Sequence, residues 1–200
     1  MIDIGCGHEA PILNAVKIDT CLKVGIDLNP VLRSDKAPAV KLVRADCSKI
    51  PFADNTFDLA ISRSVLEHLT DPDTVFHEVQ RILAPKGIFI FITPNRWDYV
   101  SIASTLIPNK LHPIIVRRLT GRNEEDTFPT QYKANSTLKL KSIANSSGFE
   151  VIRLDSLREH PHYLQFSSIS YLSGVAFEQI IQRHFKSMRP WLLGMFKKLD

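Results

Sequence analysis

The sequence contains little cysteine and no long apolar run, and each of these absences excludes a class of protein. Its three cysteines lack the paired spacing of a zinc site. Because only three cysteines occur in 200 residues, reduced thiols are favoured over a disulfide framework. No stretch reaches the roughly 18 uncharged apolar residues that a membrane-spanning helix needs. No charged leader precedes an apolar segment at the beginning of the chain, so a cytoplasmic location is the expectation.

The sequence contains enough apolar residues for one hydrophobic core, and its charged residues are unevenly distributed along the chain. Hydrophobic residues make up 44% and charged residues 23% of the chain, which predicts a single domain over residues 1–200. Basic residues outnumber acidic ones two to one from residue 131 onward. This basic part would suit anionic substrates, nucleic acid or an acidic lipid surface, or form a solvated face without a partner. Because its Lys and Arg residues are not clustered with aromatic residues, nucleic acid is not expected as a partner.

The first residues form a short apolar run that enters a glycine turn. Gly5 and Gly7 suit positive φ angles and the close approach of a ligand, and Asp27 follows at the spacing of a ribose-binding carboxylate. A dinucleotide site needs a third glycine where the helix begins, but Glu9 stands in this region and would repel a pyrophosphate. The pattern therefore favours a nucleoside ligand without phosphate, such as S-adenosylmethionine, over NAD or FAD.

Short apolar runs alternate with longer segments of helical spacing, which predicts a parallel sheet covered by helices. Asp71 and Pro72 supply an N-cap and a first-turn proline for one helix, while Lys86-Gly87 and Gly148 are expected to end helices. The expected strands span residues 2–4, 23–27, 41–44, 57–62, 87–93 and 149–154. The expected helices span residues 9–18, 72–84 and 136–147.

Six motifs in the first part of the chain resemble those of one enzyme family, in the same order. They are Asp3-Ile4-Gly5-Cys6-Gly7, Gly25-Ile26-Asp27-Leu28-Asn29-Pro30, Ala45-Asp46-Cys47-Ser48-Lys49-Ile50-Pro51-Phe52, Phe57-Asp58-Leu59-Ala60-Ile61-Ser62, Leu66-Glu67-His68-Leu69 and Leu83-Ala84-Pro85-Lys86-Gly87-Ile88-Phe89. The family is the type 11, ubiquinone/menaquinone-methyltransferase-like branch of the class I S-adenosylmethionine-dependent methyltransferases. The resemblance implies an α/β, Rossmann-like three-layer sandwich with a mostly parallel seven-stranded sheet, whose antiparallel last strand would be residues 191–196. It also implies methyl transfer to a small-molecule acceptor, and it leaves open whether the acceptor atom is O, N or C.

The same resemblance assigns a set of residues to the cofactor S-adenosylmethionine. The glycine turn would underlie the methionine part, and Asp3 would support both the turn and the ammonium group. Asp27 would hold the ribose, Asp46 would accept a hydrogen bond from the adenine amino group, and the amide of Cys47 would face the ring. The whole set is Asp3, Gly5, Cys6, Gly7, Asp27, Leu28, Asp46, Cys47, Ser62 and Arg63.

His68 is the candidate catalytic residue, because an imidazole that titrates near neutral pH can take a proton from a hydroxyl, an amine or a carbon acid. Glu67 beside it is a candidate substrate contact. Alternatively, both residues merely begin a helix next to the sheet. Some related O-methyltransferases hold a divalent metal with Glu-x-x-Glu-His, but the first position here is Ser64, so no metal is expected.

Two segments interrupt the alternation and are predicted to cover a substrate. Residues 96–135 contain several prolines, an acidic cluster and aromatic side chains, and residues 155–188 are mostly helical in pattern. Residues 168–185 would alternatively be an amphipathic helix that touches a membrane surface, although peripheral membrane contact is not the expectation. The candidate substrate contacts near the end of the fifth strand and in the first cover are Asn95, Arg96 and Tyr132.

One departure from the family concerns the beginning of the chain. The family carries a helix and further residues before the first strand, whereas Met1 stands inside that strand. We therefore expect a segment to be missing, and its loss would open the cofactor pocket to water. The alternative function is that of a truncated or degenerate S-adenosylmethionine-binding protein without transferase activity. The sequence makes no prediction about the oligomeric state.

Overall fold

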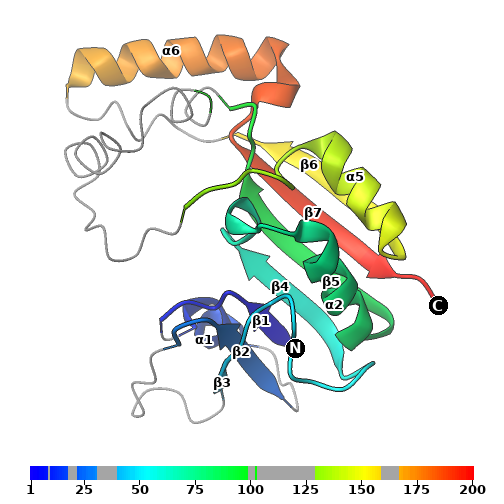
Figure 1. Ribbon diagram of the computed structural model, residues 1–200. Coiled ribbons are helices and arrows are strands. Elements are labelled where there is room, and N and C mark those ends of the chain that lie inside the picture. Colours follow the sequence, from blue (N-terminus) through cyan, green and yellow to red (C-terminus); the bar gives the residue numbers. More distant parts are fainter. Residues whose placement is uncertain (9, 18–21, 31–39, 99–101, 103–128, 159–166) are drawn as a thin grey trace.

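The structure, a computed structural model, describes residues 1–8, 10–17, 22–30, 40–98, 102, 129–158 and 167–200. Seven strands form one sheet in the order β3-β2-β1-β4-β5-β7-β6 (Figure 1). The strands are β1 (Ile2–Ile4), β2 (Lys23–Asp27), β3 (Val40–Arg44), β4 (Phe57–Arg63), β5 (Leu83–Pro94), β6 (Phe149–Leu157) and β7 (Trp191–Lys198).

The directions of the strands confirm the expected Rossmann-like sandwich. Each neighbouring pair among the first five strands is parallel, with registers such as Ile2 opposite Val24 and Ile4 opposite Ser62. Strand β7 runs antiparallel to both β5 and β6. The prediction of an antiparallel last strand is therefore confirmed, and β7 extends two residues beyond the expected end.

Helix α2 (Pro72–Ile82) begins where the sequence predicts and ends earlier. The Asp71 side chain accepts a hydrogen bond from the backbone N–H of Thr74 at 3.2 Å, and Pro72 occupies the first turn, where no N–H partner is needed. The prediction that Lys86-Gly87 ends this helix is wrong. Leu83 is already paired with Phe57 in the sheet, and burial of this leucine in a strand overrides the local helical pattern.

The two other predicted helices differ in accuracy. Helix α5 (Thr137–Ser146) lies within the expected range, and Gly148 follows it with a φ of 73°, as expected of a C-terminal glycine. Helix α1 (Pro11–Ala15) is much shorter than the predicted 9–18, since the chain is already extended at Val16. The Val16 carbonyl accepts a hydrogen bond from Nζ of Lys23 in β2 at 2.8 Å. This carbonyl therefore bonds to β2 at the point where a longer helix would have another turn.

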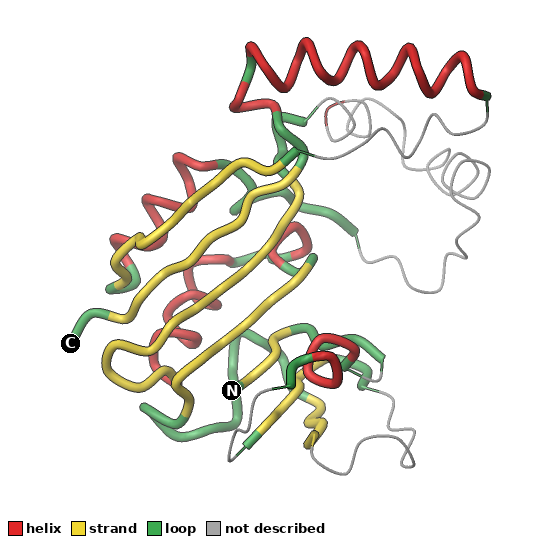
Figure 2. Tube along the Cα trace, turned by 180° about the vertical axis from the view of Figure 1, so that it is seen from behind, coloured by secondary structure: helices red, strands yellow, loops and turns green. Residues whose placement is uncertain are grey.

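The main core lies between one face of the sheet and the helices α2 and α5. Phe76 of α2 packs edge-on against Phe89 and Phe91 of β5, with ring centroids 5.5 and 5.9 Å apart. Phe149 and Phe196 of the last two strands complete this aromatic cluster. Helix α1 packs on the opposite face, and Figure 2 shows that α2 and α5 lie behind the strands when α1 is in front. The sheet is thus the middle of three layers.

A second helical region stands beyond the end of the sheet. Helix α6 (Ser168–His184) and the 3₁₀ turn η4 (Lys186–Met188) precede β7, and Figure 1 shows α6 away from α2 and α5. The helical pattern predicted within residues 155–188 is therefore confirmed for α6. Most of the other predicted cover, residues 96–135, lies outside the described residues. In the part of the chain that the structure describes, no helix has the length and apolar character to cross a membrane.

Candidate functional site

The carboxyl ends of β1, β2, β3 and β4 meet at one edge of the sheet, which we call the site edge. Parallel strands bring their carboxyl ends together, and ligands of open α/β sheets bind there. Asp27 is the last residue of β2, and its carbonyl accepts a hydrogen bond from the N–H of Ala45 at 3.0 Å. This bond ties Asp46, the next residue, to the tip of β2.

The glycine turn after β1 is bound to β2. Gly5 and Gly7 have φ angles of 71° and 62°, and the N–H groups of Gly5 and Cys6 both donate to the Ile26 carbonyl, at 2.8 and 3.0 Å. The N–H of Gly7 donates to Oδ2 of Asp27 at 2.9 Å. A Cβ on Gly7 would meet no heavy atom of the described residues within 4 Å. A ligand can therefore approach this backbone closely.

Asp3 lies below the turn with an unsatisfied carboxylate. The side chain is 1% exposed, and neither oxygen has a hydrogen-bond partner among the described residues. Burial, helped by the charge of Asp27, raises the pKa of Asp3 from 3.8 to about 7. The prediction that Asp3 supports the turn needs correction, because the N–H of Gly7 in the turn donates its hydrogen bond to Asp27 and not to Asp3. An unpaired buried carboxylate instead suits a cationic group of a ligand.

The tips of β2 and β3 combine acceptors with apolar surface. Oδ1 of Asp27 accepts a hydrogen bond from the N–H of Asn29 at 3.1 Å, and Leu28 between them is 48% exposed. Hydrogen bonds from the backbone and hydroxyl of Ser48 lower the pKa of Asp46, so this carboxylate is held ionised. Burial raises the pKa of the Cys47 thiol to about 11, which keeps it neutral.

The remaining predicted cofactor residues turn their side chains into the protein or into solvent. The buried Cys6 thiol lies 2.7 Å from the position that a Cβ on Gly25 would take, so it fills the space beside β2. The Ser62 hydroxyl is buried and donates to the Ile4 carbonyl at 3.0 Å, whereas Arg63 is exposed. Only the backbone of Ser62 is therefore left for a ligand.

Sequence reasoning missed a buried network around Glu67. Glu67, in the 3₁₀ turn η1 (Leu66–His68), is 4% exposed, and its Oε2 accepts a hydrogen bond from the Thr93 hydroxyl at 3.0 Å. The Asn135 amide donates to the same hydroxyl at 2.6 Å. Burial raises the pKa of Glu67. Threonine and asparagine are most often exposed, so nothing in the sequence marks Thr93 and Asn135 as members of a buried network.

The network joins η1 to the described end of the predicted first cover. The Glu67 carbonyl accepts hydrogen bonds from the N–H groups of Gln131 and Tyr132, at 2.6 and 3.1 Å. His68 Nδ1 lies 3.2 Å from the Pro129 carbonyl, and its Nε2 lies 3.9 Å from Oε1 of Glu67. The structure thus brings Glu67, His68 and Tyr132 together.

A packing contact connects η1 with the glycine turn. A Cβ on Gly5 would lie 2.1 Å from Cγ2 of Val65, so Val65 sits directly on the turn, three residues before His68. Val65 carries no polar group and was not singled out from the sequence. Its position brings the predicted catalytic residue and the predicted methionine-binding turn into one neighbourhood.

Asn95 is used elsewhere in the structure. Its amide donates to the carbonyls of Ser187 and Arg189 at 2.7 and 2.9 Å, and its Oδ1 accepts the N–H of Trp97 at 3.1 Å. Arg96 stacks on the Trp97 ring, with 5.1 Å between the guanidinium carbon and the ring centroid. The side chain of Asn95 therefore connects β5 to η4.

Two further features bear on predictions from the sequence. The described residues contain no group of three or more His, Cys, Asp or Glu side chains placed to hold a metal ion. Glu9, the residue expected to repel a pyrophosphate, and Cys21 lie outside the described residues.

The sequence of the site edge agrees with a known family. Residues 2–91 match the family model described as "Methyltransferase domain". The similarity to a methyltransferase domain thus covers just under half of the chain. The match contains the glycine turn, η1, α2, most of β5 and the residues Asp3, Asp27 and Asp46, so the similarity extends over the described parts of the site edge.

Curated relatives and a solved structure are also similar to this chain. Sterol 4-C-methyltransferase strm-1 of Caenorhabditis elegans is 35% identical over 109 residues, which are 48% of this chain and 32% of that protein. Cycloartenol-C-24-methyltransferase 1 of Oryza sativa subsp. japonica is 30% identical over 176 residues, or 82% of this chain and 48% of that protein. The chain thus spans at most about half the length of these relatives. The crystal structure of an S-adenosylmethionine dependent methyltransferase from Mesorhizobium loti has the same fold, with a TM-score of 0.60, 17% identity, and coverage of 98% of this chain and 89% of that chain.

S-adenosylmethionine is the cofactor that the matched family implies, and the residues of the site edge fit it. The orphaned carboxylate of Asp3 matches the positive charge of a methionine ammonium group. The open space over Gly7 leaves room for the methionine chain. The exposed Leu28 and the ionised Asp46 offer an apolar surface and an acceptor for an adenosine.

Proposed function

We propose that the chain binds S-adenosylmethionine at the site edge and transfers its methyl group to a small-molecule acceptor. The single observation that carries this proposal is the glycine turn fastened to the tip of β2 by Asp27, with the unpaired carboxylate of Asp3 beneath it. The match to the methyltransferase domain supports the same conclusion. Because the chain spans only part of its relatives, the activity needs a direct test.

The proposed contacts divide the cofactor among three strand tips. The backbone of Gly5, Cys6 and Gly7 borders the methionine part, and Asp3 neutralises the ammonium group. The oxygens of Asp27 that face solvent accept the ribose hydroxyls next to Leu28. Beyond the ribose, Asp46 and the amide of Cys47 hold the adenine edge, while Ser62 and Arg63 border the methionine end with their backbone.

Methyl transfer depends on alignment more than on elaborate catalytic groups. The bound cofactor supplies an activated methyl group, and the chain has to place an acceptor in line with it and exclude water. His68 is the proposed general base. When Nδ1 carries its proton and donates to the Pro129 carbonyl, the lone pair of Nε2 can take a proton from the acceptor. Glu67 then acts by holding the His68 turn and the segment with Tyr132 in register.

The acceptor class is drawn from the relatives and from the residues near His68. The relatives named above are a sterol 4-C-methyltransferase and a cycloartenol-C-24-methyltransferase, so sterols stand first among the acceptors to test. Tyr132 and the Arg96–Trp97 stack offer flat apolar surfaces beside the end of β5, which suits a rigid ring system. We propose Glu67, Asn95, Arg96 and Tyr132 as the residues that shape the acceptor side, the first two through the backbone they hold.

Two measurements test the proposal in sequence. Calorimetric titration should show binding of S-adenosylmethionine and of S-adenosylhomocysteine, with NADH as a ligand that should not bind. Transfer of a labelled methyl group should then be followed over an acceptor panel that begins with sterols and includes quinones, sugars and amines. Binding without transfer to any acceptor would favour the degenerate alternative, and absence of binding would remove the proposal altogether.

The role of His68 needs its own variant. His68→Gln should lower kcat by roughly 100-fold or more with little change in KM, since general-base catalysis contributes about that factor. His77→Gln is the matched control, because His77 is an exposed histidine on α2, away from the site edge. An unchanged kcat for His68→Gln would contradict a general base at this position, and catalysis would then rest on alignment of the acceptor with the methyl group.

A further inference from the structure

Helix α6 carries a stripe of exposed apolar side chains. Ile169, Leu172 and Ile180 are 79%, 66% and 60% exposed, and Phe185 just after the helix is 53% exposed. At about 100° per residue, positions 169, 172, 176 and 180 fall within one quarter of the helix surface, and the exposed Ala176 fills the remaining place. Such a continuous stripe on a surface helix indicates a partner.

The opposite side of α6 is less exposed. Gly174 and Glu178 are buried there, and Tyr171 and Val175 are half-buried. These four positions are centred on the side of the helix away from the stripe. The helix therefore buries one face and exposes its apolar stripe.

The exposed charges on α6 and η4 themselves are all positive. The sole acidic residue between positions 168 and 189 is Glu178, which is buried. Arg183 lies at the end of the stripe, and Lys186 follows it in η4; both are exposed. This arrangement complements an anionic surface with an apolar interior, which is the chemistry of a bilayer that contains acidic phospholipids.

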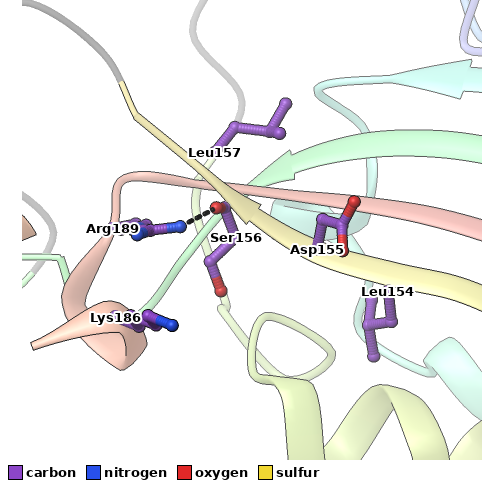
Figure 3. A pocket seen from close by; sticks show the side chains of 6 residues that line it. All are labelled: Leu154, Asp155, Ser156, Leu157, Lys186 and Arg189. Atoms are coloured by element: carbon purple, nitrogen blue, oxygen red, sulfur yellow. Dashed lines mark hydrogen bonds between the residues drawn. The ribbon is translucent and has the colours of Figure 1, made fainter.

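A hollow beside the end of the stripe adds a place for an anionic headgroup. It has a volume of about 460 Å³, and Figure 3 shows Lys186 and Arg189 on one side of it and residues 154–157 of β6 on the other. Nη1 of Arg189 donates to the Ser156 carbonyl at 3.0 Å, which orients the guanidinium group. The carboxylate of Asp155 is already paired with Arg153, so its charge is partly neutralised.

We propose that α6 and η4 dock the protein on the surface of anionic lipid bilayers. The stripe enters the boundary between headgroups and acyl chains, and Arg183, Lys186 and Arg189 contact the lipid phosphates. Because the Asn95 amide binds the carbonyls of Ser187 and Arg189, this surface is fixed directly to the end of β5. Docking would consequently hold the neighbouring site edge close to the membrane, where an apolar acceptor dissolves.

Flotation of the full chain with vesicles tests the proposal without cofactor or acceptor, so its outcome is independent of methyl transfer. The protein should float with vesicles of phosphatidylcholine and phosphatidylserine, float far less with phosphatidylcholine alone, and be released by high salt. Equal partition into both kinds of vesicle, or none into either, would overturn the proposal.

Matched variants assign the effect to α6. Leu172→Ser should reduce partition by about tenfold or more, whereas Leu138→Ser, at an 84% exposed leucine on α5, should leave it unchanged. Lys186→Gln should reduce partition into anionic vesicles by about fivefold, with Lys141→Gln on α5 as its control. Circular dichroism should show that each variant keeps its fold.

The competing use of the stripe is a protein contact. If sedimentation showed a concentration-dependent dimer that Leu172→Ser dissociates, while vesicles bound neither protein, the stripe would be an interface between copies of this chain. If both leucine variants lost the same fraction of vesicle binding, the attraction would be unspecific. Either result contradicts docking through α6.

Discussion

The N–H of Gly7 donates to Oδ2 of Asp27 at 2.9 Å, across 20 residues of sequence. This bond fastens the turn after β1 to the tip of β2, and it also orients the carboxylate that is proposed to hold the ribose. One side chain therefore shapes the methionine end and the ribose end of the same pocket.

Asp27→Asn should separate these two tasks. The amide oxygen can still accept the hydrogen bond from Gly7, so thermal unfolding should change little. The lost charge and acceptor should weaken binding of S-adenosylmethionine by about 10- to 100-fold, the effect of a charged hydrogen bond worth about 1.5–3 kcal/mol. Calorimetry measures the change, and Asp58→Asn, at an exposed aspartate on β4, controls for net charge. Equal affinities for the two variants would contradict the assignment.

The two glycines of the turn should respond differently to alanine. Gly7→Ala costs only the left-handed backbone, about 1–2 kcal/mol of stability, since a Cβ there meets no described atom within 4 Å. Gly5→Ala costs the same and adds a collision with Val65 at 2.1 Å. We expect Gly5→Ala to have the lower thermal midpoint by several degrees.

The second substitution Val65→Ala tests the cause of this difference. Combined with Gly5→Ala, it should recover part of the lost stability, because it removes the carbon atom that the new Cβ meets. Combined with Gly7→Ala, it should give no recovery. Additive losses in both pairs would mean that the collision is relieved by movement of the backbone.

Asp3 should make stability depend on pH. Its pKa is raised from 3.8 to about 7 in the folded protein, so the folded state binds a proton more tightly than the unfolded state between these values. Stability is then lost as the pH rises from about 4 to about 7, by at most roughly 4 kcal/mol. Asp3→Asn should remove this loss, so that its advantage over the natural protein in thermal unfolding grows from pH 4 to pH 8.

The affinity for the cofactor should depend on the same carboxylate, but it should rise with pH where the stability falls. A cation placed beside Asp3 favours its ionised form, so affinity for S-adenosylmethionine should rise between pH 6 and pH 8. Asp3→Asn should bind more weakly and lose this component of the pH dependence. A pH profile that is identical in both proteins would show that the ammonium group lies elsewhere.

Glu67 should matter for the structure of the acceptor side. Glu67→Ala leaves the buried Thr93 hydroxyl without its acceptor, which should cost about 1–3 kcal/mol of stability. Glu67→Gln keeps an acceptor for Thr93 and should cost less at neutral pH. Denaturant unfolding of the two variants measures the difference, and equal losses would mean that the carboxylate charge, rather than the hydrogen bond, holds the network.

The parts that could be predicted from sequence are those that depend on neighbours along the chain. The glycine turn, the N-cap at Asp71 and the acidic residues at the strand tips follow from local chemistry and from the alternation of strands and helices. The resemblance of the motifs to a known family implied the seven-stranded sheet, including the antiparallel β7. The assignment of site residues to the cofactor and acceptor stays a prediction that the experiments above address.

Other features depend on partners far away in sequence. Leu83 joins the sheet because Phe57 pairs with it, which ends α2 earlier than its pattern predicts. Asn95 turns away from the pocket because carbonyls more than 90 residues later accept its amide protons.

The sequence by itself determined the class of fold, the turn chemistry and the acidic strand tips, because short-range spacing encodes them. Only the tertiary structure decided that Glu67 is buried with Thr93, that Asp3 has no hydrogen-bond partner among the described residues, and that α6 turns its apolar stripe outward. Burial and pairing at these positions result from packing between distant segments, and no local pattern of residues specifies such packing.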